Sequence, residues 1–390
     1  MIPKKIMQLF SKKRLFVPLL NYKDQHKFIH DLNSFPIPNN FSCRIDCPNM
    51  EHQKIIQRLI EYYHFIKSDF SEQQIISGND LWKHICQGHA LLEAALGSRD
   101  VEIVSEMMLN VCNTPGLTVG FENSVPNATE EYKQFLSLNL VDKLIALGES
   151  LGCIPVQCPE QGMWGYEKLN VNELVELIQA RLPFDLTAPI AGGGVFGLET
   201  QYGILSERNL QAVYTAAKAH NLLDGSKKKI VCEIGGGIGS LTYYLAKAGM
   251  AEISLYDLPT VSIIQGYYLA KSLGLESVWF YGEVPRPCQI RILPYWSLDS
   301  APDKYFSLAI NQDSLPEIDR TIALSYCKLL SKICDGYFLS INQEGQGGNT
   351  DGHHQSVVYE LIESVGGFQR IQRNPDWMRG GYVSEVYKIL

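Results

Sequence analysis

A glycine-rich turn between an apolar run and a helical pattern is the feature that most constrains this chain. The apolar run covers residues 229–234, and the turn from Glu233 to Ser240 reads EIGGGIGS. Glycine lets the backbone turn sharply and lets a ligand approach the main chain, while a helix N-terminus offers unpaired N–H groups. The pattern therefore predicts a strand, a ligand-binding turn and a helix, with a nucleotide-like ligand.

The spacing of the glycines distinguishes between nucleotide ligands. A dinucleotide fingerprint, G-x-G-x-x-G, that starts at Gly235 needs a third glycine at position 240, where the chain has Ser240. Asp257 lies eighteen residues past Gly239, and a carboxylate at the end of a second strand can accept hydrogen bonds from ribose hydroxyls. Glu233 repels a phosphate but suits a cationic or amino-bearing ligand. These observations favour S-adenosylmethionine over NAD.

Apolar runs and helical periods alternate from residue 207 to the C-terminus. The predicted helices are 207–220, 238–248, 261–273, 315–332 and 354–364. The predicted strands are 229–234, 252–256, 290–293, 306–310, 336–341 and a closing pair, 368–373 and 382–389. Strands that alternate with helices of this length form a parallel sheet with helices on both faces. The expected fold class is α/β, with a Rossmann-like doubly wound sheet.

The first half of the chain has a different texture. Apolar residues recur at three- and four-residue spacing between about residues 49 and 179, which is typical of helices. The stretch 182–203 then brings prolines and the run AGGGVFG, which a regular helix does not accommodate. We therefore predict two domains: a mainly helical one, residues 1–188, for capping or dimerisation, and a sheet domain, residues 189–390.

Composition excludes several classes of protein. The chain of 390 residues has 34 Lys and Arg against 42 Asp and Glu, a net charge of −8, which disfavours nucleic acid as a partner. Its ten cysteines include no C-x-x-C pair, so we interpret them as reduced thiols of a cytoplasmic protein. A transmembrane segment is not expected, because the sequence contains no run of about 18 apolar residues. The basic stretch 4–14 lacks the apolar core of a signal peptide.

Several segments resemble a known family. The turn at Gly235, followed by Asp257, is similar to the first motifs of class I S-adenosylmethionine-dependent methyltransferases, and the D-L-P segment at Asp257 resembles small-molecule O-methyltransferases. The segments NQDSLPE, from Asn311, and WMRGGYVSEV, from Trp377, resemble bacterial putative sugar O-methyltransferases. The resemblance covers roughly residues 190–390. It implies a methyltransferase sheet, S-adenosyl-L-methionine as cofactor and transferase activity in sugar O-methylation.

The resemblance also implies a cofactor site. It places four turn residues on the methionine side of the cofactor, Asp257 on the ribose and Leu258 near the adenine. The turn residues are Glu233, Gly235, Gly237 and Gly239. The stretch 189–208 directly precedes the predicted sheet and is a candidate lid, in which Tyr202 contacts the methionine end. Each assignment has an alternative. The glycines can form a tight turn that binds no ligand, and Asp257 can simply end a strand or cap the following helix. The stretch 189–208 can be a flexible linker.

Candidate catalytic residues follow the predicted strands, because ligands of doubly wound sheets bind at the carboxyl ends of the strands. His353 or His354 is the proposed general base, since an imidazole titrates near neutral pH. Asp313 is a second candidate, as the base or as a group that orients the histidine. Glu317 is a third, although Ser314-x-x-Glu317 equally matches a capping box.

A magnesium ion is a further candidate component of the site. Carboxylates such as Asp313, Glu317 and Glu344 are ligands of the type that Mg²⁺ takes, and the ion would lower the pKa of a sugar hydroxyl. The spacing of these residues does not require a metal, so we assign no metal ligand.

The expected function is that of a cytoplasmic O-methyltransferase whose small-molecule acceptor is a hydroxyl of a sugar, a nucleotide-sugar or a glycan precursor. A homodimer is an open alternative to a monomer. A natural-product O-methyltransferase that acts on a phenol or polyketide is disfavoured, because the His-Asp-Trp segment of such enzymes does not follow the fourth strand. A non-catalytic, cofactor-binding scaffold protein is the alternative from another class. A nicotinamide oxidoreductase is disfavoured by Ser240.

Overall fold

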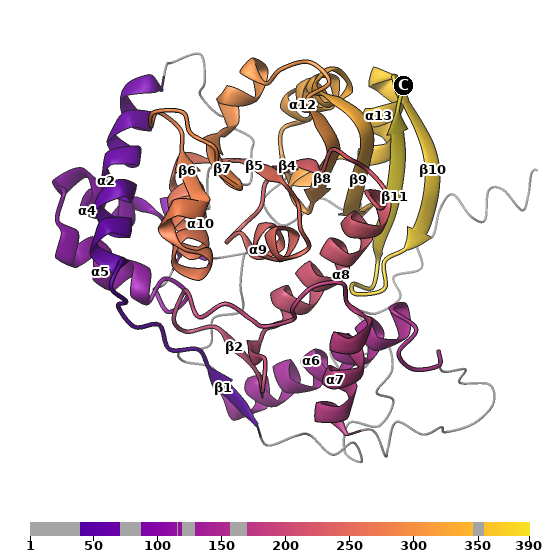
Figure 1. Cartoon of the computed structure of the whole chain (residues 1–390), viewed down its shortest axis with the longest axis horizontal. Coiled ribbons are helices and arrows are strands. Elements are labelled where there is room, and N and C mark those ends of the chain that lie inside the picture. Colours follow the sequence, from indigo (N-terminus) through magenta and orange to yellow (C-terminus); the bar gives the residue numbers. More distant parts are fainter. Residues whose placement is uncertain (1–39, 71–86, 115, 119–128, 157–169, 346–354) are drawn as a thin grey trace, which may run out of the picture.

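A mixed eight-stranded sheet lies at the centre of the protein (Figure 1). The computed structural model describes residues 40–70, 87–114, 116–118, 129–156, 170–345 and 355–390. The strand order is β10-β11-β9-β8-β4-β5-β7-β6. The strands are β4 (Ile230–Ile234), β5 (Glu252–Asp257), β6 (Val278–Phe280), β7 (Ile290–Pro294), β8 (Phe306–Gln312), β9 (Cys334–Gln343), β10 (Phe368–Pro375) and β11 (Tyr382–Ile389). The six strands from β9 to β6 run parallel, and β11 lies antiparallel between β9 and β10.

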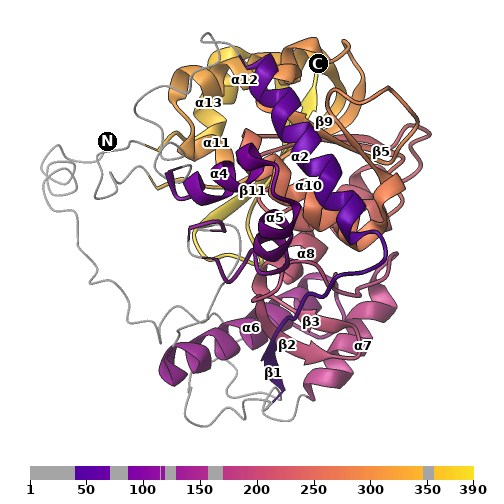
Figure 2. The same cartoon turned by 90° about the vertical axis from the view of Figure 1, so that its left-hand side faces the viewer.

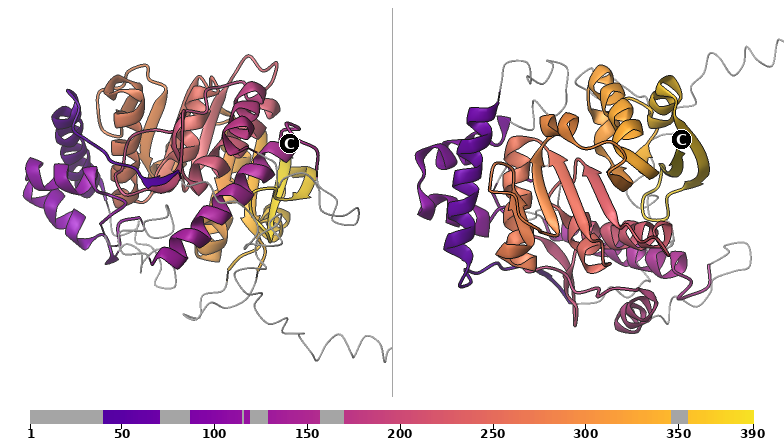
Figure 3. Two further views of the ribbon diagram at one scale, coloured as in Figure 1. Left: turned by 90° about the horizontal axis from the view of Figure 1, so that it is seen from below. Right: turned by 45° about the horizontal axis from the view of Figure 1, so that its top comes forward.

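Helices cover both faces of this sheet (Figure 1, Figure 3). One face carries α8 (Glu207–Leu222), α9 (Ser240–Lys247) and α10 (Pro259–Leu273), and the other carries α11 (Ser314–Glu317), α12 (Arg320–Ile333) and α13 (Val358–Val365). Successive strand residues enter different cores, since side chains alternate across a strand: Val231 packs with the first group and Cys232 with the second. The expected doubly wound, Rossmann-like α/β class is confirmed.

The structure corrects one predicted helix and adds an edge strand to the predicted sheet. The helix expected over residues 315–332 is two helices, α11 and α12, because Ile318 between them is extended, with φ −81° and ψ 148°. Asp319 starts the second helix, since its Oδ1 accepts a hydrogen bond from Thr321 N–H at 2.9 Å, a favourable N-cap. The edge strand β6 was not expected, because three residues are too few to show a period.

The described part of the first 188 residues is mainly helical, as expected. Its helices are α2 (His52–Asp69), α4 (Ala90–Ser98), α5 (Val101–Leu109), α6 (Glu130–Ser150) and α7 (Val171–Arg181). Helix α2 packs on α10, and α6 packs on α8 (Figure 2). Buried residues of both helices, such as Leu59 and Leu144, belong to the same hydrophobic core as α8 to α10. The division at residue 188 and the capping or dimerisation role stay predictions.

A small second sheet joins segments on either side of that predicted boundary. Its strands are β1 (Phe41–Cys43), β2 (Phe196–Thr200) and β3 (Gly203–Leu205), all antiparallel. The glycine-rich run from Ala191 to Val195, just before β2, is buried. The run is therefore packed into the protein and is not an exposed linker.

Within the described ranges, no helix has both the length and the apolar character needed to cross a membrane.

Candidate cofactor and acceptor site

The carboxyl ends of the parallel strands meet at one edge of the sheet. Strand β4 pairs with β5 on one side and with β8 on the other, so the order in which successive strands join the sheet reverses at β4. In open α/β sheets, ligands bind in the crevice at such a switch point. Glu233 lies at the end of β4, Asp257 ends β5 and Asp313 follows β8. The structure thus brings three residues predicted for the site to the same edge.

The turn after β4 has the backbone that its glycines predict. Gly235, Gly237 and Gly239 have φ values of 71°, 57° and 97°, a region that other residues rarely adopt. A Cβ atom on Gly235 would overlap the hydroxyl group of Ser314, so this position excludes any side chain. Helix α9 begins directly after the turn. Its N-terminus therefore faces the carboxyl edge of the sheet.

Glu233 is a buried carboxyl group. Its residue is 3% exposed, and Thr242 Oγ1 donates a hydrogen bond to its Oε2 at 2.5 Å. Burial raises the pKa of Glu233 to about 7; the Thr242 hydrogen bond lowers this pKa and the charge of Asp257 raises it. A ligand with a positive amino group would stabilise the ionised carboxylate.

Asp257 is a buried carboxyl group surrounded by donors. Leu258 N–H donates to its Oδ1 at 2.8 Å, and Gln265 Nε2 donates to its Oδ2 at 2.6 Å. Burial raises the pKa of Asp257 to about 7, whereas these hydrogen bonds and those from the N–H groups of Gly236 and Gly237 lower it. A carboxylate has about four acceptor positions, so ribose hydroxyls must replace some of the present donors.

Leu258 is the neighbour of Asp257 in the chain, whereas Tyr202 belongs to the small second sheet. Leu258 is the N-cap residue of α10, directly after Asp257, and is half-buried. Tyr202 lies in the turn between β2 and β3, where its carbonyl accepts a hydrogen bond from Ala188 N–H at 2.8 Å. The contact of Tyr202 with the methionine end of a cofactor stays a prediction.

A network of charged side chains holds Asp313 at the end of β8. Its two carboxylate oxygens accept hydrogen bonds from Arg379 Nη1, and Arg208 Nη1 lies 3.4 Å from Oδ2. The guanidinium carbon of Arg379 lies 3.6 Å from the ring centroid of Tyr382. Asp313 has a φ of 73°, and such strained backbone persists only where the surrounding structure holds it. Two guanidinium groups therefore already share the lone pairs of Asp313, and its role as a base or as a group that orients a histidine stays a prediction.

The predicted capping box at Ser314 and Glu317 is not formed. Ser314 is the first residue of α11, not the residue before it, and its hydroxyl donates to Ile234 O at 3.1 Å. Asn311 Nδ2 donates to the Ser314 hydroxyl oxygen at 2.6 Å and to Ile234 O at 3.0 Å. Ser314 therefore binds the end of β4 beside the glycine turn. Glu317 is half-buried in α11 and stays a catalytic candidate.

His353 and His354 lie outside the described residues, so their role as general base stays a prediction. The described chain resumes at residue 355, and Ser356 N–H donates to Pro316 O at 3.0 Å. The segment after the two histidines therefore runs against α11, the helix that follows Asp313.

The carboxylates named for magnesium do not gather. In the part of the chain that the structure describes, no group of three or more His, Cys, Asp or Glu side chains could hold a metal ion. Asp313 pairs with arginines, and Glu344 accepts two hydrogen bonds from Arg373 at 2.7 and 2.8 Å. A dependence on Mg²⁺ stays a prediction.

Two partners of the buried carboxyl groups were missed by the sequence analysis. Thr242 and Gln265 are both fully buried. Thr242 follows Glu233 by nine positions and Gln265 follows Asp257 by eight, so each lies in the helix directly after its strand. A polar residue at this spacing on a buried helix face is the signal that would have found them.

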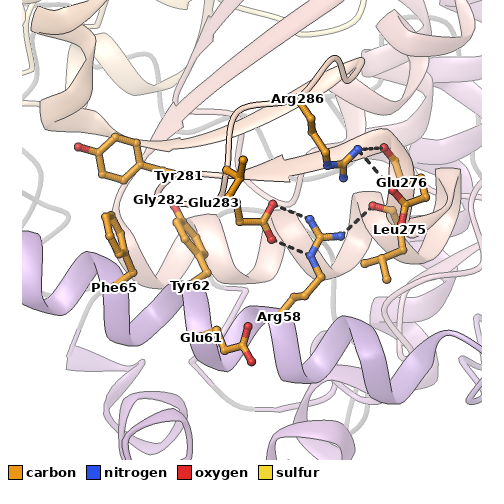
Figure 4. A pocket seen from close by; sticks show the side chains of 11 residues that line it. Arg58, Glu61, Tyr62, Phe65, Leu275, Glu276, Tyr281, Gly282, Glu283 and Arg286 are labelled. Atoms are coloured by element: carbon orange, nitrogen blue, oxygen red, sulfur yellow. Dashed lines mark hydrogen bonds and ion pairs between the residues drawn. The ribbon is translucent and has the colours of Figure 1, made fainter.

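A cavity of about 580 Å³ lies elsewhere, between α2 and the loop after β6 (Figure 4). Arg58 donates two hydrogen bonds to Glu283, both at 2.7 Å, and Arg58 and Arg286 both donate to Val278 O in the edge strand. These arginines cover a carbonyl group of β6 that would otherwise be open to another strand. The residues predicted for the site do not line this cavity.

The sheet, its switch point and the glycine turn define a Rossmann-like α/β protein. No family model matches the chain, and no curated protein matches it. Among solved structures, it is similar to the mitomycin 7-O-methyltransferase MmcR, with a TM-score of 0.34 and 16% identity over 47% of this chain and 57% of that one. It is also similar to a putative SAM-dependent methyltransferase from Streptococcus mutans, with a TM-score of 0.33 and 10% identity over 48% and 51% of the two chains.

A third similar structure is geranyl diphosphate methyltransferase in complex with SAM, with a TM-score of 0.34 and 11% identity over 47% of this chain and 90% of that one. The matched part spans little more than half of the first two proteins. At these TM-scores and identities, the similarity does not assign a function to this chain.

Proposed function

We propose that this protein transfers a methyl group from S-adenosylmethionine to a hydroxyl group of a sugar or nucleotide-sugar. One observation carries the proposal: Glu233 and Asp257, two buried carboxyl groups, end neighbouring parallel strands beside a turn with three positive-φ glycines. Neither takes part in an ion pair among the described residues. A cationic ligand would find its counter-charge here, whereas a phosphate would be repelled.

Each part of this site has its own task in the proposal. The bound cofactor would supply a methyl group on a positively charged sulfur, which is a good leaving group. The ionised carboxylate of Glu233 binds the amino end of the cofactor, and Asp257 accepts hydrogen bonds from the ribose hydroxyls. Leu258 packs near the adenine. The turn residues Gly235, Gly237 and Gly239 give the main chain the positive-φ path along which the cofactor would lie.

The network around Asp313 supports a polyhydroxylated acceptor. Asp313, Arg208 and Arg379 combine acceptors and donors with fixed directions, which suit the adjacent hydroxyl groups of a sugar. Arg379 already occupies a face of the Tyr382 ring, so Trp377, partly buried next to this network in the chain, is the better candidate to stack on a pyranose.

Methyl transfer to a hydroxyl group also needs a group that removes its proton. We assign this role to His353 or His354, with Asp313 as the residue that orients the histidine. The segment after the histidines runs against α11, which supports this pairing. A sugar hydroxyl is a weak acid, so an imidazole accepts its proton late in the transfer. Glu317, at the far end of α11, is the second candidate.

Binding of S-adenosylhomocysteine, measured by calorimetry, tests the cofactor assignment. Asp257→Ala is expected to abolish binding while circular dichroism shows an intact fold. Asp319→Ala is the matched control, since Asp319 also accepts a backbone hydrogen bond but caps the remote helix α12. Its affinity should equal that of the wild type. Unchanged affinity in Asp257→Ala would remove the ribose assignment, and a wild type that binds NAD instead would refute the proposal.

Turnover measurements separate the remaining possibilities. Cofactor consumption is expected with sugars or nucleotide-sugars and not with phenols. Consumption with phenols alone would favour a natural-product O-methyltransferase, and binding without any consumption would favour a scaffold protein. Of His353→Ala and His354→Ala, one is expected to lose turnover by about 100-fold with unchanged cofactor affinity. Full turnover in both variants would move the base to another residue.

A further inference from the structure

We propose that Asp46, in the region before the sheet, is a positioning residue for the cofactor turn. This inference rests on the proposed function, since it assigns to Asp46 the task of holding the surface on which that turn packs. The surface belongs to the second glycine-rich run of the chain, Gly192–Gly194.

Asp46 is a fully buried carboxylate that joins separate segments. Its side chain is 0% exposed. The Tyr267 hydroxyl donates to its Oδ2 at 2.6 Å, and Gly192 N–H donates to the same oxygen at 3.1 Å. Lys271 Nζ forms an ion pair with Oδ1 at 3.3 Å and donates its hydrogen bond to Cys47 O at 2.5 Å. Buried polar groups with several directed partners fix the segments that supply those partners.

Gly192 connects this carboxylate to the cofactor turn. The φ of Gly192 is 77°, and a Cβ atom on it would lie 3.6 Å from Ile238 Cδ1. Ile238 stands between Gly237 and Gly239, is 2% exposed and anchors the turn in the hydrophobic core. Asp46 therefore holds Gly192, and Gly192 forms part of the surface against which Ile238 packs.

Main-chain contacts hold the neighbouring residues of the same run. Gly193 N–H donates to Leu109 O at 2.9 Å, and Gly194 N–H donates to Arg44 O at 2.8 Å. These contacts keep the run in place when a side chain is changed. The contact from Asp46 to Gly192 can therefore be removed without release of the whole run, although the same change also removes the contacts of Asp46 with Tyr267 and Lys271.

Asp46 also binds the helix that follows the predicted ribose ligand. Tyr267 lies on α10, which begins two residues after Asp257. The region before the sheet holds this helix at a second point, where the Tyr62 hydroxyl donates to Ser262 Oγ at 3.1 Å. Contacts from residues before 188 thus reach α10, the helix after Asp257, directly, and the cofactor turn through Gly192.

Variants of Asp46 and Lys271 separate positioning from stability. Asp46→Ala removes the acceptor for Gly192 N–H, whereas Asp46→Asn keeps an acceptor oxygen. Lys271→Met breaks the buried ion pair but leaves Gly192 untouched, so it is the matched control for stability. Affinity for S-adenosylhomocysteine is expected to fall about tenfold or more in Asp46→Ala and to stay within about threefold in the other two variants, even where their melting temperatures fall.

Hydrogen exchange without ligand is a second readout that does not depend on the cofactor. Asp46→Ala should speed the exchange of amides in 192–195 and 235–240 relative to those of β9, and Asp46→Asn should not. Wild-type affinity together with wild-type exchange in Asp46→Ala would overturn the positioning role, as would an equal loss of affinity in Lys271→Met. If the wild type binds no S-adenosylhomocysteine, the proposed function fails, and the exchange rates still decide the role of Asp46.

Discussion

Two parts of the carboxyl edge contain acidic side chains in opposite electrostatic settings. At the ends of β4 and β5, Glu233 and Asp257 have hydrogen-bond donors around them, and burial raises the pKa of each to about 7. At the end of β8, Asp313 is bound to Arg379 and lies near Arg208. Glu233 and Asp257 form no ion pair with any side chain that the structure describes, so a ligand can supply the positive charge, whereas Arg379 and Arg208 already neutralise Asp313. This difference supports a cationic cofactor at β4 and β5 and a neutral, polar acceptor beside β8.

The largest loss of cofactor affinity is expected when a side chain is added to the glycine turn of the first part. Gly235→Ala would place a Cβ atom into the Ser314 hydroxyl at a φ of 71°, so we expect loss of S-adenosylhomocysteine binding and about 3 kcal/mol of unfolding free energy. Gly249→Ala is the matched control, because its φ is 80° and no atom lies within 4 Å of the added Cβ. Only the cost of the left-handed backbone, about 1 kcal/mol, is expected there. If Gly235→Ala and Gly249→Ala lost the same affinity in calorimetry and the same unfolding free energy in urea, the close approach of Gly235 to Ser314 would have no effect on binding or stability.

A proton-linked affinity is the next effect in size. In the free protein, carboxyl groups with a pKa of about 7 are protonated below neutral pH, and a ligand ammonium group favours their ionised form. Affinity is therefore lost as the pH falls through 7, and we expect it to rise about tenfold from pH 6 to pH 8. Glu233→Gln should flatten this rise in calorimetric titrations. An affinity for S-adenosylhomocysteine that does not change with pH would contradict the counter-charge role.

The smallest effects are expected at two arginine-bound carboxylates, Asp313 of the second part and Glu344 after β9. Asp313→Asn leaves Arg379 half-buried without its anion, at a cost of about 1–2 kcal/mol in urea unfolding, and should reduce turnover without a change in cofactor affinity. Glu344→Gln should cost less than about 0.5 kcal/mol, since Arg373 is 36% exposed and keeps its ion pair with Glu385. If Asp313→Asn reduced cofactor affinity more than turnover, Asp313 would belong to the cofactor site, and the distinction between a cofactor part and an acceptor part would be wrong.

Sequence patterns predicted those elements whose signals are local. Apolar runs bounded by glycine predicted β4 and β5, and the turn between Glu233 and Ser240 has the positive φ values that its glycines suggest. The same reasoning failed at residue 318, because an apolar period does not show that Asp319 starts a new helix. The prediction of a capping box at Ser314 was wrong for a different reason. The Ser314 hydroxyl donates its hydrogen bond to the carbonyl of Ile234, a residue eighty positions away.

The alternation of strands and helices, the glycine turn and the carboxyl groups at the strand ends follow from the sequence itself, because each depends on residues close together in the chain. The order of the strands across the sheet does not, since β4 pairs with β8, which is distant in the sequence. Tertiary structure alone decided which groups surround those carboxylates. Asp313 and Arg379 are 66 positions apart, and Asp46 and Gly192 are 146 apart. Such pairs form only when helices pack on the sheet and bring distant segments together, and neither periodicity nor spacing in the sequence reports that packing.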